Sequence, residues 1–120
     1  MTSEPTGNVA DEAADFDTLQ QQLMVEIGQA LIEQSVSGTV ALDLVVTQQA
    51  EATGVGLDFR LNLERQSGLT VPAAAGDALI EVVQRLVLLW RDHGRAPWRT
   101  LTYRLSRGDA GPRFTSEFSF

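Results

Sequence analysis

His93 is the only histidine in the chain, and the sequence contains no cysteine. Catalysis by histidine requires a positioned partner group, and a metal site requires further ligands, so His93 alone supports neither chemistry. It directly follows an apolar segment with helical periodicity, and a hydrogen-bond donor or cation in a last helical turn interacts favourably with the helix dipole. We therefore interpret His93 as a helix-end residue and expect no catalytic residue, no metal and no cofactor.

Three arginines, Arg91, Arg95 and Arg99, surround the same helix end and have the charge to bind carboxylates or phosphates. Arg91 and Arg95 are equally suited to hydrogen-bond the last carbonyls of the helix. The Gly54-x-Gly56 pair lies between two predicted strands, whereas phosphate-binding loops join a strand to a helix. No nucleophile, base and orienting group can be assigned from spacing. We expect a protein that is not an enzyme and that acts through a surface.

The charge is unevenly distributed along the 120 residues. Residues 1–59 hold ten acidic and no basic residues, a net charge of −10, whereas residues 60–120 hold nine arginines against six acidic residues, a net charge of +3. The overall charge of −7 argues against nucleic acid, whose phosphates would be repelled, and favours a basic partner or simply solubility. The longest apolar run, 86–90, is too short to span a membrane. With no cysteine and no signal-peptide pattern, a cytoplasmic protein is expected.

The predicted elements begin after an acidic tail. Residues 1–14 have hardly an apolar anchor, which predicts disorder, and a helix is expected to begin near Asp15 or Asp17 and to end at Ser37-Gly38. Its apolar residues recur at spacings of three and four, and polar residues including Glu26 and Glu33 form the opposite stripe. A second, more apolar helix begins between residues 72 and 77 and ends at Gly94, with Glu81 and Arg85 at ion-pair spacing.

Strict alternation of apolar and polar residues predicts strands over 40–46 and 55–64, and two last strands over 98–106 and 113–120. A turn and a short third strand are expected over 66–71. The predicted fold is a single α+β domain over 15–120 with the order α-β-β-(β)-α-β-β. Because each strand has one apolar and one polar face, we expect an antiparallel sheet with both helices packed on one face.

The face without helices is the candidate binding surface. Its predicted partner-binding residues, together with two from the acidic stripe of the first helix, are Asp43, Asp58, Arg60, Asn62, Glu64, Arg104, Glu117, Glu26 and Glu33. Complementary charge on such a surface accelerates association with a basic protein.

The segment Gly94-x-x-Pro97-Trp98-x-x-Leu101-x-Tyr103-x-Leu105, followed by Gly111, Phe114, Phe118 and Phe120, resembles the closing segment of the YezG-like immunity (antitoxin) proteins. The stretch Ile27-Gly28-x-Ala30-Leu31 resembles that family's opening helix. The likeness covers residues 17–120. The turn over 107–112 is longer than the family's, Ser116 replaces an apolar residue, and the acidic ending is missing.

This resemblance implies a small cytoplasmic YezG-like immunity domain over 15–120, which binds the C-terminal toxin domain of a polymorphic toxin in a 1:1 complex. Such a protein neutralises its toxin by covering the active site or an essential surface, and the toxin is a nuclease, an NAD-degrading enzyme or another activity. No binding residues follow from the motif, because immunity surfaces differ with their toxins. Two alternatives remain: an acidic secretion or effector chaperone acting as a homodimer, and a ligand-binding domain or small enzyme with a concave apolar pocket.

Overall fold

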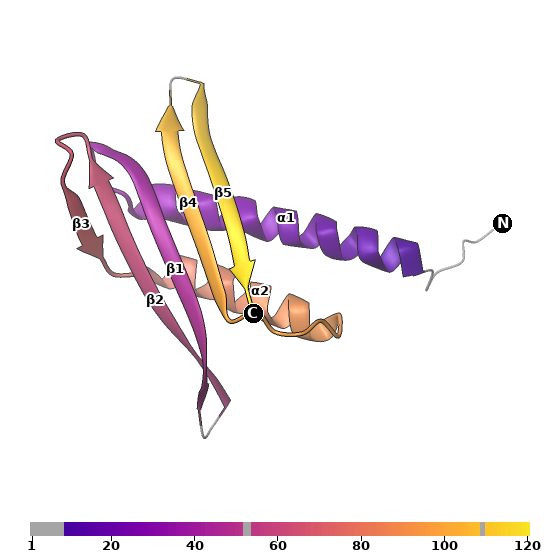
Figure 1. The fold of residues 1–120 in the computed structure, drawn as a ribbon. Helices are drawn as coiled ribbons and strands as arrows, with labels where there is room; N and C mark the ends of the chain where they lie inside the picture. The colour runs from indigo at the N-terminus through magenta and orange to yellow at the C-terminus, as the bar shows by residue number, and fades with distance from the viewer. Residues whose placement is uncertain (1–8, 52–53, 109) are drawn as a thin grey trace.

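The computed structural model describes residues 9–51, 54–108 and 110–120, with side chains from residue 15 onward apart from those at 50–55. The elements follow the order α1 (Val9–Gln34), β1 (Thr39–Glu51), β2 (Gly54–Arg65), β3 (Thr70–Ala73), α2 (Asp77–Asp92), β4 (Thr100–Gly108) and β5 (Gly111–Ser119). The chain forms one α+β domain in which two helices lie behind a five-stranded antiparallel sheet (Figure 1). The predicted fold class is confirmed, including the third strand.

The first helix starts earlier than predicted. α1 begins at Val9, ahead of Asp15 and Asp17, so neither residue caps its N-terminus. The sequence over 10–14 lacks large apolar residues but is rich in alanine and acidic residues, which favour a helix and its first turn without any packing. The predicted tail therefore extends no further than residues 1–8, which lie outside the described residues.

The sheet has the strand order β3-β2-β1-β4-β5, so β1 lies at its centre. The β1–β2 ladder continues to the pair Glu51–Gly54, beyond the predicted end of the strand at Val46. Thr47, Gln48 and Gln49 interrupt the apolar alternation, but ladder hydrogen bonds join backbones and do not require apolar side chains. As a result the β1–β2 hairpin extends past α2 (Figure 1).

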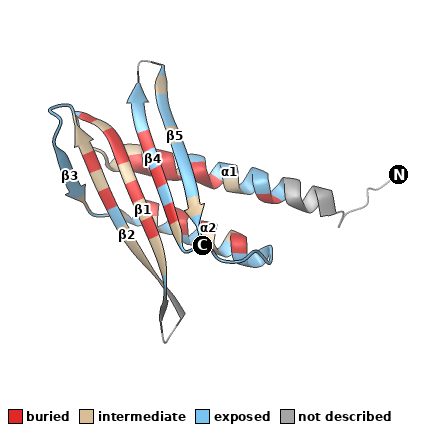
Figure 2. Cartoon of the chain, viewed as in Figure 1, coloured by how far each residue is buried: buried red, intermediate tan, exposed pale blue. Residues whose placement is uncertain are grey.

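Both helices cover the same face of the sheet, as predicted. That face contributes Leu42, Leu44 and Val46 from β1 and Leu101, Tyr103 and Leu105 from β4, all at 2% exposure or less. Burial is concentrated on the central strands, whereas β3 and β5 at the edges of the sheet are mostly exposed (Figure 2). On the other face, β1 residues of the opposite parity, such as Asp43 and Val45, remain partly exposed.

The end of α2 is a Schellman motif. The N–H of Arg95 donates to the carbonyl of Trp90, and the N–H of Gly94 donates to that of Arg91, both at 3.0 Å. Gly94 has φ +67°, a backbone conformation that glycine adopts without steric cost. The chain then turns at Pro97, and Trp98 is buried at 1% exposure. The indole N–H of Trp98 has no partner among the described residues, so this ring stabilises the corner through apolar contact.

Gly28 and Tyr103 bring α1 against β4. The Tyr103 hydroxyl donates a 2.8 Å hydrogen bond to the carbonyl of Met24, one helical turn before Gly28. A Cβ atom at Gly28 would lie 2.8 Å from the same hydroxyl oxygen. The absence of a side chain at Gly28 therefore allows the helix to cross directly over the tyrosine.

Candidate binding surfaces

The face of the sheet without helices holds all seven predicted sheet residues. Asp43 of β1 lies opposite Asn62 of β2 and Arg104 of β4, and Glu117 of β5 lies opposite Thr102. Asp58, Arg60 and Glu64 share the parity of Asn62 along β2, so their side chains project from the same face. Four strands thus contribute polar side chains to one continuous surface, which we call the polar sheet face.

Arg104 is the centre of an ion-pair network on the polar sheet face. Its Nη1 donates to both carboxylate oxygens of Asp43 at 2.7 Å, and its Nη2 donates to Glu64 at 3.3 Å. Hydrogen bonding to Asp43, and then to Glu64, raises the pKa of the Arg104 guanidinium above its ordinary value. Asp58 and Arg60 form a second, looser pair at 3.4 Å. The carboxylates of this face are therefore largely compensated by arginines from the same face.

The two predicted residues of α1 lie elsewhere. The helices cover the opposite side of the sheet, so Glu26 and Glu33 lie on a different side of the molecule from the polar sheet face. Glu26 accepts a hydrogen bond from Arg85 of α2, which corrects the predicted pairing of Arg85 with Glu81. Glu33 is exposed.

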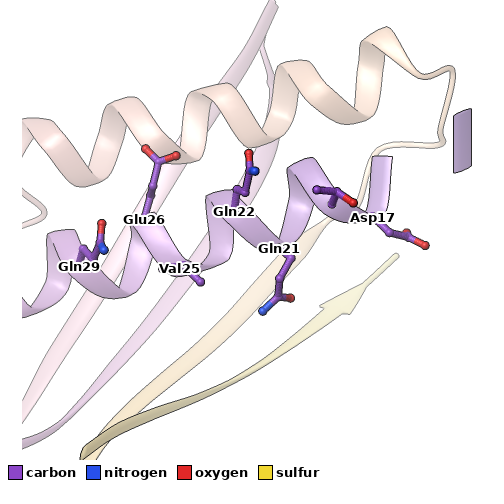
Figure 3. A pocket seen from close by; sticks show the side chains of 7 residues that line it. Asp17, Gln21, Gln22, Val25, Glu26 and Gln29 are labelled. Atoms are coloured by element: carbon purple, nitrogen blue, oxygen red, sulfur yellow. The ribbon is translucent and has the colours of Figure 1, made fainter. Parts of the chain in front are cut away.

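A shallow hollow lies along α1, and Glu26, which bonds Arg85 of α2, is part of its lining (Figure 3). It is lined by side chains of this helix alone, among them Asp17, Gln21, Gln22, Val25 and Gln29. Figure 3 shows them spread along the helix, without convergence on a common point. A surface of this kind offers polar contact to a partner but does not enclose a ligand.

A deeper groove of about 830 Å³ lies between α2 and the part of the β1–β2 hairpin that extends past it. Its apolar lining comprises Leu57 and Phe59 of β2, Ile80, Val87, Leu88 and Trp90 of α2, and Pro97 from the corner. Gln48, Gln84, Arg91 and Arg95 supply its polar groups. We refer to this site as the α2–hairpin groove. This groove was not predicted from the sequence. α2 nevertheless carries more apolar residues than can be buried on one side of a helix.

The side chains of Arg91 and Arg95 do not bond the last carbonyls of α2, which was one of the two roles considered for them. Backbone N–H groups bind the last carbonyls of α2, while the Arg95 guanidinium stacks 3.7 Å from the centre of the Phe16 ring. His93 is the C-cap of α2, and its Nδ1 lies 3.0 Å from the carbonyl oxygen of Leu89, consistent with the helix-end interpretation. Arg99 is exposed beyond the corner.

Within the described ranges, no three His, Asp or Glu side chains are arranged as metal ligands. No helix among the described residues has the length and hydropathy to cross a membrane. The chain matches no protein-family model and no curated protein.

Proposed function

We propose that this protein is a cytoplasmic immunity protein that binds the C-terminal toxin domain of a polymorphic toxin and blocks it by covering its active site or an essential surface. The observation that carries the proposal is the uncovered polar sheet face, to which β1, β2, β4 and β5 all contribute charged side chains. The resemblance of the Pro97-Trp98 corner and of the Gly28 segment to YezG-like proteins supports the choice of partner. The net charge of −7 favours a basic toxin.

The test is co-expression with the toxin domain encoded by the neighbouring gene, followed by cell survival and isolation of the complex. Survival together with a 1:1 complex is the expected result. Killing of the cells without complex formation would refute the proposal. The variant Asp43→Arg tests the surface, because it reverses a charge at the centre of the polar sheet face. Glu81→Arg makes the same change in charge at an exposed residue of α2, on the other side of the molecule, and is the matched control.

The confirmed third strand supports a second candidate. With β3 the element order is α-β-β-β-α-β-β, the order of the secretion and effector chaperones considered above. Such chaperones act as homodimers, so light scattering of the purified protein separates the two candidates. A mass near 13.1 kDa for the free chain favours the immunity protein, and about twice that mass favours the chaperone.

A further inference from the structure

The α2–hairpin groove combines apolar walls with a cationic end. Leu88 is 42% exposed, and Leu57, Phe59, Ile80 and Val87 are only partly buried. Large apolar side chains gathered in one concavity are typical of binding sites, because their burial by a partner removes apolar surface from water. The volume is within the range of ligand and peptide pockets.

The charge of the groove is opposite to that of the protein as a whole. None of its described lining residues is acidic, while Arg91 and Arg95 lie at the C-terminal end of α2. The closest carboxylate to Arg91 is that of the adjacent Asp92, at 3.9 Å with both side chains mostly exposed. Among the described residues no carboxylate forms an ion pair with Arg95, whose guanidinium instead covers the Phe16 ring. Both cations therefore retain donors for an acidic group.

The shape of the groove favours a helical occupant. On its helix side, Ile80, Gln84, Val87, Leu88 and Arg91 recur at spacings of three and four, so they form one ridge along α2. A second helix packs along such a ridge with its own apolar residues at the same spacings. The sheet side of the groove, with Leu57 and Phe59, contacts the same apolar stripe of the occupant.

We propose that the α2–hairpin groove binds an acidic amphipathic helix of a partner protein. The apolar stripe of this helix lies between α2 and the hairpin, and a carboxylate at one end binds Arg91 and Arg95. This inference concerns the helix side of the molecule and does not depend on whether the polar sheet face binds a toxin.

The probe is a fluorescein-labelled synthetic peptide of about 18 residues, or about five helical turns. It carries leucine at i, i+3, i+4 and i+7 positions and glutamate elsewhere. The reference peptide has lysine in place of every glutamate. Binding is measured by fluorescence anisotropy, and a change in tryptophan emission, to which Trp90 of the groove contributes, reports occupancy. Because the protein carries a net charge of −7, non-specific electrostatics favour the lysine peptide, so preference for the glutamate peptide identifies the groove.

The double variant Arg91→Glu/Arg95→Glu is expected to lower the affinity for the glutamate peptide by at least about tenfold. The matched control, Arg60→Glu/Arg113→Glu, makes the same change in net charge on the polar sheet face and should leave relative affinity for the two peptides unchanged. The variant Arg91→Gln/Arg95→Gln should lower the affinity by a smaller factor. It replaces the charge-reversal variant in this test if charge reversal perturbs folding. Leu88→Gln should also weaken binding, whereas Leu69→Gln, at an exposed leucine outside the groove, should not.

The proposal is overturned if the glutamate peptide does not bind, or if it binds wild type and the Arg91/Arg95 variants equally. A second ligand, dodecanoate, is tested below its critical micelle concentration. The proposal is also overturned if dodecanoate binds, and its binding is weakened by the Arg91/Arg95 and Leu88 substitutions, while the peptide does not bind. That result would make the groove a site for a small amphipathic anion. Circular dichroism and urea unfolding of each variant establish that the fold is intact.

Discussion

Burial of Tyr103 makes the free energy of unfolding depend on pH. Burial raises the pKa of its phenol well above the ordinary value of about 10, and the hydrogen bond with the Gly28 backbone lowers it only in part. The pKa of Tyr103 is higher in the folded protein than in the unfolded chain. The buried neutral phenol therefore makes its full contribution to the free energy of unfolding below about pH 10, and this contribution is lost as the pH rises toward the folded pKa. The chain has one tyrosine, no lysine and no cysteine, so no lysine or thiol contributes to the loss of stability that begins near pH 10.

We therefore expect the free energy of unfolding to fall above about pH 10 in the wild type and to remain flat in Tyr103→Phe. Urea unfolding as a function of pH measures this difference, and alkaline ultraviolet absorbance follows the single phenol directly. At neutral pH the substitution should cost about 0.5–1.5 kcal/mol for the hydrogen bond to Met24. Phenolate formation near pH 10 without unfolding would contradict the burial of Tyr103.

Gly28 and Tyr103 should be strongly coupled. Alanine is favoured over glycine in a helix by about 1 kcal/mol, but its Cβ would lie 2.8 Å from the Tyr103 oxygen. We expect Gly28→Ala to be destabilising overall, since overpacking costs about 1–3 kcal/mol. In a Tyr103→Phe background the nearest ring carbon would be 4.0 Å away, an ordinary contact, so the same substitution should become neutral or stabilising. A double-mutant cycle from urea unfolding measures the coupling, and additive effects would refute the contact.

At the scale of elements, the type and order of both helices and all five strands were predicted. All but β3 carry the periodicity of a buried side, whereas β3 is mostly exposed and lies over Thr70–Ala73, later than the predicted 66–71. Element ends were less well predicted where backbone hydrogen bonds or intrinsic propensity act without apolar side chains. α1 thus begins at Val9, and the β1–β2 ladder continues to Glu51. The α2–hairpin groove was not predicted because its walls come from segments far apart in the sequence: Leu57 and Phe59 lie in a predicted strand and α2 is a predicted helix, but periodicity does not show that they face each other across an open groove. Its one signal in the sequence is the surplus of apolar residues on α2, which does not say what covers them.

The Schellman motif predicts a specific role for Gly94 in ending α2. At φ +67° a residue with a side chain costs about 1–2 kcal/mol, and no atom lies within 4 Å of a Cβ built there. Gly94→Ala should therefore lower the free energy of unfolding by this backbone cost alone. Gly108→Ala is the matched control, because that glycine also has open space but lacks a positive φ. Equal effects of the two substitutions in thermal or urea unfolding would argue against the motif.

At the scale of the whole molecule, folding brings the acidic first half of the chain against the arginines of the second half. Arg85 bonds Glu26, and Arg104 bonds Asp43, so helix packing and strand pairing both join segments of opposite charge. The sequence revealed this charge asymmetry but not the partners, which depend on register and on how α1 and α2 cross. The same pairing compensates the polar sheet face and Arg85, whereas Arg91 and Arg95 at the groove have no comparably close carboxylate among the described residues.

Removal of Arg104 should therefore have an effect that depends on salt. In Arg104→Met the carboxylates of Asp43 and Glu64 lose their shared counter-charge in a protein that already carries a net charge of −7. All three side chains are more than 40% exposed, so screening by solvent limits the loss to about 1 kcal/mol at low ionic strength. In about 1 M salt, where the Debye length is about 3 Å, the difference from wild type should largely disappear.

Urea unfolding at both ionic strengths measures this difference, with Arg60→Met as the control for a looser pair. A loss that persists unchanged at high salt would indicate that Arg104 stabilises the sheet through packing of its aliphatic stem instead of through its charge.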